Sequence, residues 1–422
     1  MAHPPNPAPQ QPGLLHQIGP GLVTGAADDD PSGIATYSQV GAQFGYALAW
    51  TMLFSLPLMI VVQEISARIG AVTGHGIADN LRRHYNPWLA RSVVLLLLVA
   101  NTINLGADLG AMGAALQLIL GGDDRLYTAG FGIACIAAEV LVSYARYAKL
   151  LKWLTLSLFA YVAVVFAVHV PWQHALLATL VPRFVFDAPH AMALVAVLGT
   201  TISPYLFFWQ AAMEVEELHR AKTPPLVTTP RQAPLSFHRI RVDTVIGMTF
   251  SNVVAVFIII ATAATLHAAG ITDIQTSAQA AEALRPIAGN LTFAVFAIGI
   301  IGTGLLAVPV LAGSGAYAVA ELFRLPEGLD RRPLQAKWFY AVIAASTLAG
   351  IALNFTAIDP VKALYWSAVL NGLLSAPLLA VIMFLATNPR AMGRLTIPRP
   401  MRLAGWLATL VMTLAGAGFF LL

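Results

Sequence analysis

The chain has 422 residues, of which 58% belong to the apolar set and only 10% carry a charge, against about 25% charged residues in soluble domains. Its mean hydropathy is +0.73, and about three water-soluble domains of roughly 150 residues each could not cover their surfaces with so few charges. One bilayer crossing takes about 20 apolar residues, so the composition predicts a polytopic helical membrane protein. The single cysteine, Cys135, excludes an intrachain disulfide and a thiolate metal cluster. The net charge of +4 is too small to indicate a nucleic-acid partner.

The chain divides into a tail and eleven apolar stretches. Residues 1–17 are rich in Pro and Gln and carry no Lys or Arg, so they lack the charged start of a signal peptide and predict a short disordered cytoplasmic tail. Some of the stretches are long enough to require a tilt or a break. The stretches cover residues 18–45, 47–68, 88–120, 127–145, 149–170, 190–217, 242–267, 290–323, 336–354, 361–386 and 403–421. The longest connection, 218–241, is rich in Pro, Arg and Thr and is predicted to be a loop.

Basic residues are distributed unequally between the two predicted sides of the membrane. If the tail is cytoplasmic, twenty of the 24 Lys and Arg residues fall in cytoplasmic loops or helix ends. These are Arg68, Arg82, Arg83, Arg91, Arg146, Lys149, Lys152, Arg220, Lys222, Arg231, Arg239, Arg241, Arg324, Arg331, Arg332, Lys337, Arg390, Arg394, Arg399 and Arg402. The other side keeps only Arg125, Arg183, Arg285 and Lys362. This positive-inside pattern supports eleven spans with the N-terminus inside and the C-terminus outside.

The densest group of polar residues inside an apolar stretch is GAADDDPSG, residues 25–33. Pro31 removes an amide donor and disfavours helix at Asp30, and Gly33 tolerates almost any backbone angle. The helix is therefore predicted to open here, with free carbonyl groups next to the carboxylates of Asp28, Asp29 and Asp30. Hard divalent cations prefer such oxygen ligands. The alternative is three aspartates in water at a helix end, which the apolar runs on both sides disfavour.

The sixth stretch carries a matching sequence, GTTISPY, at residues 199–205, where Pro204 again interrupts an apolar helix. The two interruptions are five spans apart. Because an odd number of spans inverts the second copy, 18–170 and 190–387 are predicted to be inverted five-helix repeats, followed by an extra helix at 402–422. Such repeats place two discontinuous helices around a substrate and ion site near the middle of the membrane.

The segment GPGLVTGAADDDPSGIATYSQ resembles the first span of the Nramp divalent-metal transporters, whose signature there is Asp-Pro-Gly-Asn. Gln63 with the segment SARIGAVTGHGIADNLRRHY resembles their second span and its exit, and the pair Asp108-Leu109 resembles part of their third. The likeness runs through all eleven spans and is close in the first three. It implies an all-α membrane protein of the LeuT-like fold, with inverted repeats, discontinuous spans 1 and 6, and alternating access.

The departures from the family pattern bear on the choice of ion. The family's Asp corresponds to Asp30, but its Asn corresponds to Gly33, and its Met in span 6 corresponds to Ser203. Because a hydroxyl is a harder ligand than a thioether, and smaller groups widen the site, these changes favour a partly hydrated ion such as Mg²⁺. Tyr205 and Ala111 replace a histidine and a glutamate of the route by which Nramp proteins are thought to move protons. The sequence therefore resembles the divergent, magnesium-transporter-like branch, and proton coupling is disfavoured.

The resemblance and the two interruptions together predict a metal site. Asp30 is expected to be the principal charged ligand, completed by backbone oxygen atoms of Thr200 and of the first interruption, which includes Gly33. Ser203 is expected to supply a direct or water-mediated oxygen. No cofactor is expected, since the divalent cation is the transported substrate.

Other polar residues are expected around that site. Asp28 and Asp29 either hold a second layer through waters or attract cations from the vestibule. Asn371 is the amide nearest to a glutamine that the family places in span 10, and it either joins the metal shell or bonds another helix. Asp108 and Tyr205 are assigned to the ion pathway, with a helix-end Arg or a backbone amide as the alternative partner of Asp108.

The sequence thus predicts a secondary transporter or facilitator of divalent cations, with Mg²⁺ favoured and Mn²⁺ second, and not an enzyme. Its expected setting is a bacterial-type inner membrane, as a monomer or weak oligomer. Nucleotide-binding signatures such as GxxxxGK[ST] are absent from the chain. Three alternatives stay open: a proton-coupled Mn²⁺/Fe²⁺ symporter, an amino-acid transporter whose substrate carboxylate the three aspartates would repel, and an intramembrane hydrolase using Asp108 and the Asp28–Asp30 cluster.

Overall fold

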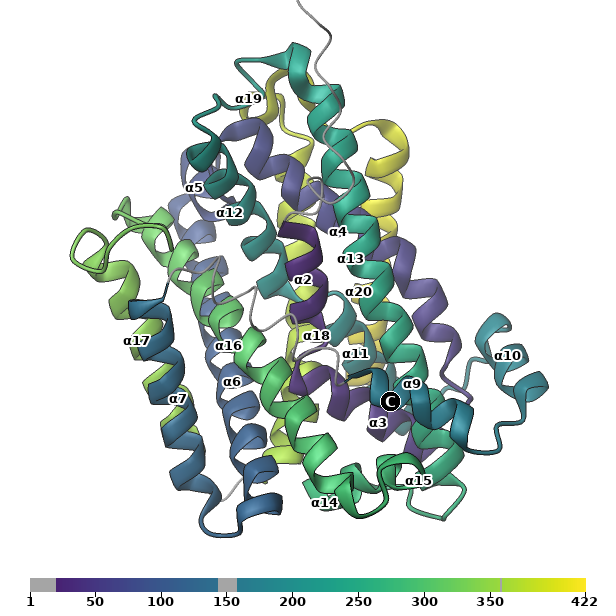
Figure 1. The fold of residues 1–422 in the computed structure, drawn as a ribbon. Coiled ribbons are helices and arrows are strands. Elements are labelled where there is room, and N and C mark those ends of the chain that lie inside the picture. The colour runs from purple at the N-terminus through teal and green to yellow at the C-terminus, as the bar shows by residue number, and fades with distance from the viewer. Residues whose placement is uncertain (1–19, 143–157, 357–358) are drawn as a thin grey trace, which may run out of the picture.

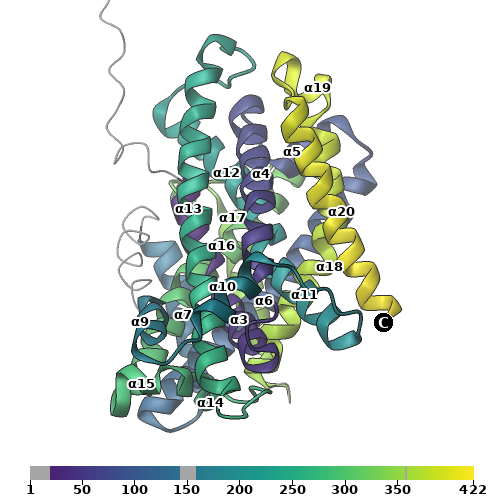
Figure 2. The same cartoon turned by 90° about the vertical axis from the view of Figure 1, so that its right-hand side faces the viewer.

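The computed structural model describes residues 20–142, 158–356 and 359–422, and every regular element in these ranges is a helix. Figure 1 shows the helices as one bundle with α2 near its middle, and Figure 2 shows α20 along one edge. The predicted tail, residues 1–17, lies outside the described residues, as do Arg146, Lys149 and Lys152.

The first half of the chain forms eight described helices and ends with two short ones. They are α2 (Pro20–Asp28), α3 (Pro31–Phe44), α4 (Trp50–Thr73), α5 (Ile77–His84), α6 (Pro87–Leu120), α7 (Asp124–Leu141), α9 (Phe159–Ala167) and α10 (Trp172–Leu180). Of the predicted stretch 149–170, the described part is helical over α9. Helix α10 falls between two predicted stretches and was not expected.

The second half begins with another pair of consecutive helices and ends with α20. Its α-helices are α11 (Ala188–Thr201), α12 (Pro204–Ala221), α13 (Ala233–Thr262), α14 (Ser277–Ala281), α15 (Arg285–Ala288), α16 (Thr292–Phe323), α17 (Lys337–Leu353), α18 (Pro360–Ala386), α19 (Pro389–Met392) and α20 (Arg399–Leu421). A π-helical turn, Ala263–His267, extends α13.

The predicted loop 218–241 is too long, because helices enter it from both ends. Helix α12 continues to Ala221 and α13 begins at Ala233. Hydropathy marks the apolar part of a helix, whereas backbone hydrogen bonds continue into polar turns. One such polar contact joins the two helices outside the apolar part, where Arg239 donates to Glu214 at 2.5 Å. Glu214 is therefore a buried ion-pair partner.

Seven helical segments in the described ranges are long and apolar enough to cross a bilayer. The protein is therefore an integral multi-pass membrane protein. The count of eleven crossings and the sides on which the termini lie remain predictions.

Close helix packing brings the interrupted helices to the centre of the bundle. Helix α2 packs against α13 and α16, and α11 packs against α18 (Figure 1). Glycine permits the closest of these contacts, since a Cβ atom on Gly199 would lie 2.7 Å from the Gly372 Cα, and one on Gly25 would lie 2.8 Å from the Gly247 Cα. Small residues at helix contacts are the usual device for close packing in membranes. The result is a tightly enclosed region around residues 28–33 and 200–205.

Candidate functional site

The first interruption lies between the end of α2 at Asp28 and the start of α3 at Pro31. Asp30 is the N-cap of α3, with extended backbone angles of φ −70° and ψ 170°, and its Oδ1 accepts a hydrogen bond of 2.6 Å from the Gly33 amide. Proline is favoured at the first helical position, and aspartate is among the preferred N-caps. Local sequence therefore explains both where the helix breaks and how the Asp30 carboxyl is oriented.

The second interruption lies between the end of α11 at Thr201 and the start of α12 at Pro204. The Ser203 hydroxyl donates to the carbonyl oxygens of Gly199, at 2.7 Å, and Thr200, at 2.8 Å. The Ile202 carbonyl accepts from the Ser375 hydroxyl of α18 at 2.6 Å. Nearby hydroxyl groups thus donate to three of the backbone carbonyl groups at this interruption, and the hydroxyl oxygens can still accept a hydrogen bond or bind a cation.

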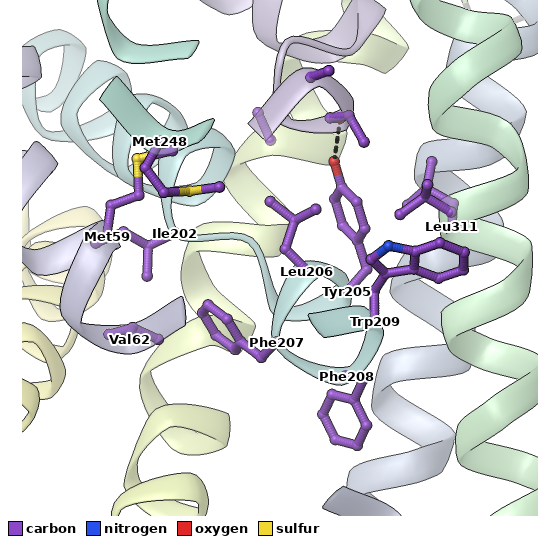
Figure 3. Packing of buried hydrophobic residues seen from close by; sticks show 14 of the residues in the cluster. Met59, Val62, Ile202, Tyr205, Leu206, Phe207, Phe208, Trp209, Met248 and Leu311 are labelled. Carbon is purple, nitrogen blue, oxygen red and sulfur yellow. Dashed lines mark hydrogen bonds between the residues drawn. The ribbon is translucent and has the colours of Figure 1, made fainter. Parts of the chain in front are cut away.

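Tyr205 connects the two interruptions. It lies in the first turn of α12, and its hydroxyl donates to the Ala27 carbonyl at 3.0 Å (Figure 3). The same hydroxyl lies 3.3 Å from Asp30 Oδ2. The ring is buried beside Leu206 and Trp209. Tyr205 therefore ties the end of α2 to the start of α12.

The Asp30 carboxylate is 3% exposed and is surrounded by uncharged donors. The Gly33 amide donates to Oδ1 and Asn104 Nδ2 donates to Oδ2 at 3.1 Å, and the Tyr205 hydroxyl shares its one proton between Oδ2 and the nearer Ala27 carbonyl. An ionised carboxylate offers about four lone-pair sites, so three donors leave it able to accept another partner. A carboxylate inside a membrane protein without a neutralising partner is costly and indicates a functional site.

Asp28 and Asp29 face a different helix from Asp30. The Ser251 hydroxyl of α13 lies 2.7 Å from Asp28 Oδ2 and 3.1 Å from Asp29 Oδ1. Both aspartates are 1% exposed, and each keeps one carboxylate oxygen without a hydrogen bond to any described residue. The three consecutive acids therefore divide between α13 on one side and α6 with α12 on the other.

Asp108 lies fully buried on α6, close enough to Asp30 for their charges to repel. Neither of its carboxylate oxygens makes a hydrogen bond to a described residue. Neither of the two alternative partners predicted for Asp108, a helix-end Arg and a backbone amide, is among its described hydrogen-bond partners. The role of Asp108 in an ion pathway stays a prediction.

On α18, serine and not asparagine contacts the first interruption. The Ser32 hydroxyl lies 3.2 Å from the Ser367 hydroxyl and 3.2 Å from the Leu364 carbonyl oxygen. Asn371 is buried one turn further along, where its carbonyl accepts from Ser375 at 2.8 Å. Asn371 is not among the described hydrogen-bond partners of Asp30.

The sequence reasoning missed three polar residues that the fold brings to this region: Asn104, Ser251 and Ser367. A signal existed for Asn104, because it precedes Asp108 by four residues and so shares its helix face. Ser251 and Ser367 lie in long apolar helices where single hydroxyls are common, and no local signal distinguishes them. Their contacts depend on how distant helices pack.

Two broken helices around a buried carboxylate, within a helical membrane bundle, are typical of transporters. The family model described as natural resistance-associated macrophage protein-like (Nramp) matches residues 21–422, so the chain belongs to the Nramp family. Members of this family are transporters and not enzymes, and they carry metal as substrate without a cofactor. The predicted family is confirmed, and the hydrolase alternative is set aside.

Curated relatives agree with this assignment, and solved structures share the fold. The chain is 28% identical over 411 residues to the divalent metal cation transporter MntH of Klebsiella pneumoniae (strain 342), covering 95% of this chain and 93% of that protein. MntH of Verminephrobacter eiseniae (strain EF01-2) is 28% identical over 376 residues, or 84% of this chain and 81% of that protein. A crystal structure of the Eremococcus coleocola manganese transporter superposes with a TM-score of 0.77 at 16% identity, covering 97% of this chain and 87% of that one.

The fold extends beyond metal transporters. Mhp1, a nucleobase-cation-symport-1 family transporter, matches with a TM-score of 0.54 at 12% identity, covering 96% of this chain and 92% of that one. At such identities the two structural matches show the fold alone. They confirm the predicted all-helical, LeuT-like fold class.

Proposed function

We propose that this protein moves divalent metal cations across the membrane by alternating access, with Asp30 as the principal charged ligand. The observation that carries the proposal is the buried Asp30 carboxylate, held by three uncharged donors between two interrupted helices. Buried charges in proteins are paired or coordinate metals, and a divalent cation would supply the missing positive charge. The relatives named as divalent metal cation transporters support the same substrate class.

The remaining ligands are proposed from both interruptions. Ser203 and the Thr200 carbonyl supply oxygen atoms from the second interruption, after the hydrogen bond between them rearranges. Gly33 holds Asp30 through its amide, and its missing side chain leaves room for a hydrated ion. Backbone carbonyls next to Gly33 complete the shell.

Four further residues have supporting roles in the proposal. Asp28 and Asp29 form an outer layer that attracts cations or binds them through water. Asp108 and Tyr205 line the ion pathway beside Asp30. Asn371 joins the shell only when the helices move, since it lies one turn away from the Ser32–Ser367 contact.

We propose Mg²⁺ as the favoured ion and Mn²⁺ as the second, because every proposed ligand is a hard oxygen atom. A membrane potential of about −100 mV gives a doubly charged cation about 4.6 kcal/mol of inward driving force, from roughly 2.3 kcal/mol per charge. Uptake therefore needs no coupled proton. A proton-coupled Mn²⁺ or Fe²⁺ symporter is the alternative. It is supported by the match to the Eremococcus coleocola protein, which is a manganese transporter.

The organisation of the chain is part of the same proposal. Residues 18–170 and 190–387 form the inverted repeats, and 402–422 forms the extra helix. The N-terminus lies in the cytoplasm and the C-terminus outside, in a bacterial-type inner membrane, because the basic residues follow the positive-inside pattern. The protein acts as a monomer or a weak oligomer.

Flux into proteoliposomes tests the proposal. Protein is reconstituted with an inside-negative potential, and entry of Mg²⁺, Mn²⁺ and Ca²⁺ is followed together with the pH of the lumen. We expect Mg²⁺ and Mn²⁺ to enter without acidification. Metal-dependent acidification would establish the symporter instead, and no divalent flux above that of protein-free liposomes would contradict the proposed function.

A further inference from the structure

Asn104 is a fully buried amide on α6 that contacts the Asp30 carboxylate. Its Nδ2 donates to Asp30 Oδ2 at 3.1 Å, and its Oδ1 has no hydrogen bond to any described residue. We propose that Asn104 is a further cation ligand that sets the preference of this site for hard divalent ions. This inference rests on the proposed function, since it concerns the same site.

The orientation of the amide follows from the chemistry of its partner. An ionised carboxylate only accepts hydrogen bonds, so the NH₂ group of Asn104 must face Asp30 and its oxygen must face away from that bond. The oxygen is then a buried acceptor without a described donor, and buried acceptors are normally satisfied. A half-turn of the amide about its last side-chain bond would direct Oδ1 toward a cation held by Asp30, where the NH₂ group now lies.

Asn104 shares its helix face with Asp108. Residues four apart on an α-helix lie one above the other, and α6 is helical without a break from Pro87 to Leu120. Asp108 is also fully buried, with both carboxylate oxygens lacking a described hydrogen bond. This face of α6 therefore holds three buried oxygen atoms without a described hydrogen bond, one from Asn104 and two from Asp108. Mg²⁺ and Ca²⁺ each take six or more oxygen ligands, including amide carbonyls, which is the chemistry that this face offers.

The α6 face also has the rigidity that a selective site needs. Helix α6 packs along α16 and α18, two other long helices of the bundle. The two interruptions are local breaks in the chain, whereas an unbroken helix holds its side chains at fixed spacing. Asn104 thus offers a ligand from a continuous helix, whereas the other proposed ligands lie at helix ends.

Two substitutions separate a ligand from a residue that only orients Asp30. Asn104→Leu keeps the approximate size and removes both polar atoms, and Asn104→Cys offers a soft sulfur in place of a hard oxygen. Binding of Mg²⁺, Mn²⁺ and Cd²⁺ to the purified protein and their flux into proteoliposomes are measured for each. We expect Asn104→Leu to weaken Mg²⁺ binding by at least about tenfold. Asn104→Cys should lose Mg²⁺ and gain Cd²⁺, since sulfur prefers soft ions.

Asn101 provides a matched control on the same helix. It is 2% exposed and has an unpartnered Oδ1 among the described residues, but its Nδ2 donates to Leu311 and Ser314 of α16, at 3.0 and 2.8 Å. Asn101→Cys should leave the ratio of Mg²⁺ to Cd²⁺ binding unchanged. Because a merely structural role would not alter metal preference, an unchanged ratio in Asn104→Cys, or an equal change in Asn101→Cys, would overturn the inference. If Asn104→Leu does not fold, the ratio in Asn104→Cys decides alone.

The wild-type protein separates this inference from the proposed function. Divalent flux in the wild type together with an unaltered Asn104→Cys ratio would refute the role of Asn104 and leave the transporter intact. A wild type that neither binds nor moves a divalent cation would refute the proposed function itself.

Discussion

Both helix interruptions contain a proline, but the first carries three acidic side chains and the second carries no charged side chain. The first places Asp28, Asp29 and Asp30 in buried positions, where some of their oxygen atoms have no hydrogen bond to a described residue. The second carries no charge, and the Ser203 hydroxyl donates to carbonyl groups in the last turn of α11. In the proposed function, the first interruption provides the charge that holds a cation and the second provides further oxygen ligands. Tyr205 links the two interruptions.

The largest effect is expected from removing the charge at Asp30. Asp30→Asn keeps an acceptor for the Gly33 amide and so preserves the N-cap, but it deletes the charge that we propose neutralises the cation. Divalent flux into proteoliposomes should fall to the level of protein-free liposomes, with the protein still monodisperse in detergent. Wild-type flux in this variant would mean that the first interruption does not hold the cation.

A smaller effect is expected at Asp28, which faces α13 through Ser251. Asp28→Asn leaves Asp30 and its donors in place and removes one outer charge. Loss of an outer partner weakens metal binding by about 10- to 100-fold, so we expect weaker affinity with little change in maximal flux. Titration of flux against Mg²⁺ concentration measures both quantities. A loss as complete as that of Asp30→Asn would show that the aspartates act as one group.

Substitutions at the second interruption should change the ion preference more than the total flux. Ser203→Cys replaces a hard oxygen with a soft sulfur at nearly constant size. We expect Mg²⁺ flux to decrease several-fold while Mn²⁺ and Cd²⁺ flux is kept or increased. Ser375→Ala, which removes a neighbouring hydroxyl bonded to Ile202, serves as the control and should not alter the preference. Equal losses for all three ions in Ser203→Cys would place Ser203 outside the metal shell.

The smallest effect on transport is expected in the connection after α16. Burial, followed by repulsion from Glu321 and Asp79, raises the pKa of Glu327 to about 9 from its ordinary value of 4.5. An acid with a raised pKa in the folded state stabilises the fold below its unfolded pKa, and this contribution is lost as pH rises through about 9. The melting temperature of the wild type should therefore fall more between pH 6 and pH 9 than that of Glu327→Gln. Equal falls would show that the pKa of the half-buried Glu327 is not raised in the folded protein. Metal flux should be unaffected.

Local sequence was sufficient for the first interruption and insufficient for its surroundings. Pro31 and the N-cap preference of aspartate fix where α3 begins and how Asp30 is oriented, because both effects act within one turn. Asn104 and Ser251 reach the same region from helices 74 and 223 residues away, as the separations of their contacts show. Hydropathy indicates that such helices are buried, but it does not determine which face of one meets another.

The same limit explains a contact missed on α18 and the wrong length of one predicted loop. The resemblance in span 10 indicates Asn371, whose place in the metal shell stays a prediction, and it carries no signal for the contact of Ser367 with Ser32, one turn nearer the start of α18. The predicted loop 218–241 was too long because polar residues continue a helix outside its apolar part. Both differences concern register and length, which depend on tertiary packing.

The location of the bound cation tests the central claim most directly. Crystals of the protein grown with Mn²⁺ and measured at the manganese absorption edge give an anomalous signal only where the metal is bound. We predict one principal peak within coordination distance of an Asp30 carboxylate oxygen, between the two interruptions. A protein that transports Mn²⁺ but shows its peak elsewhere, with Asp30 still bonded only to its three donors, would contradict the account.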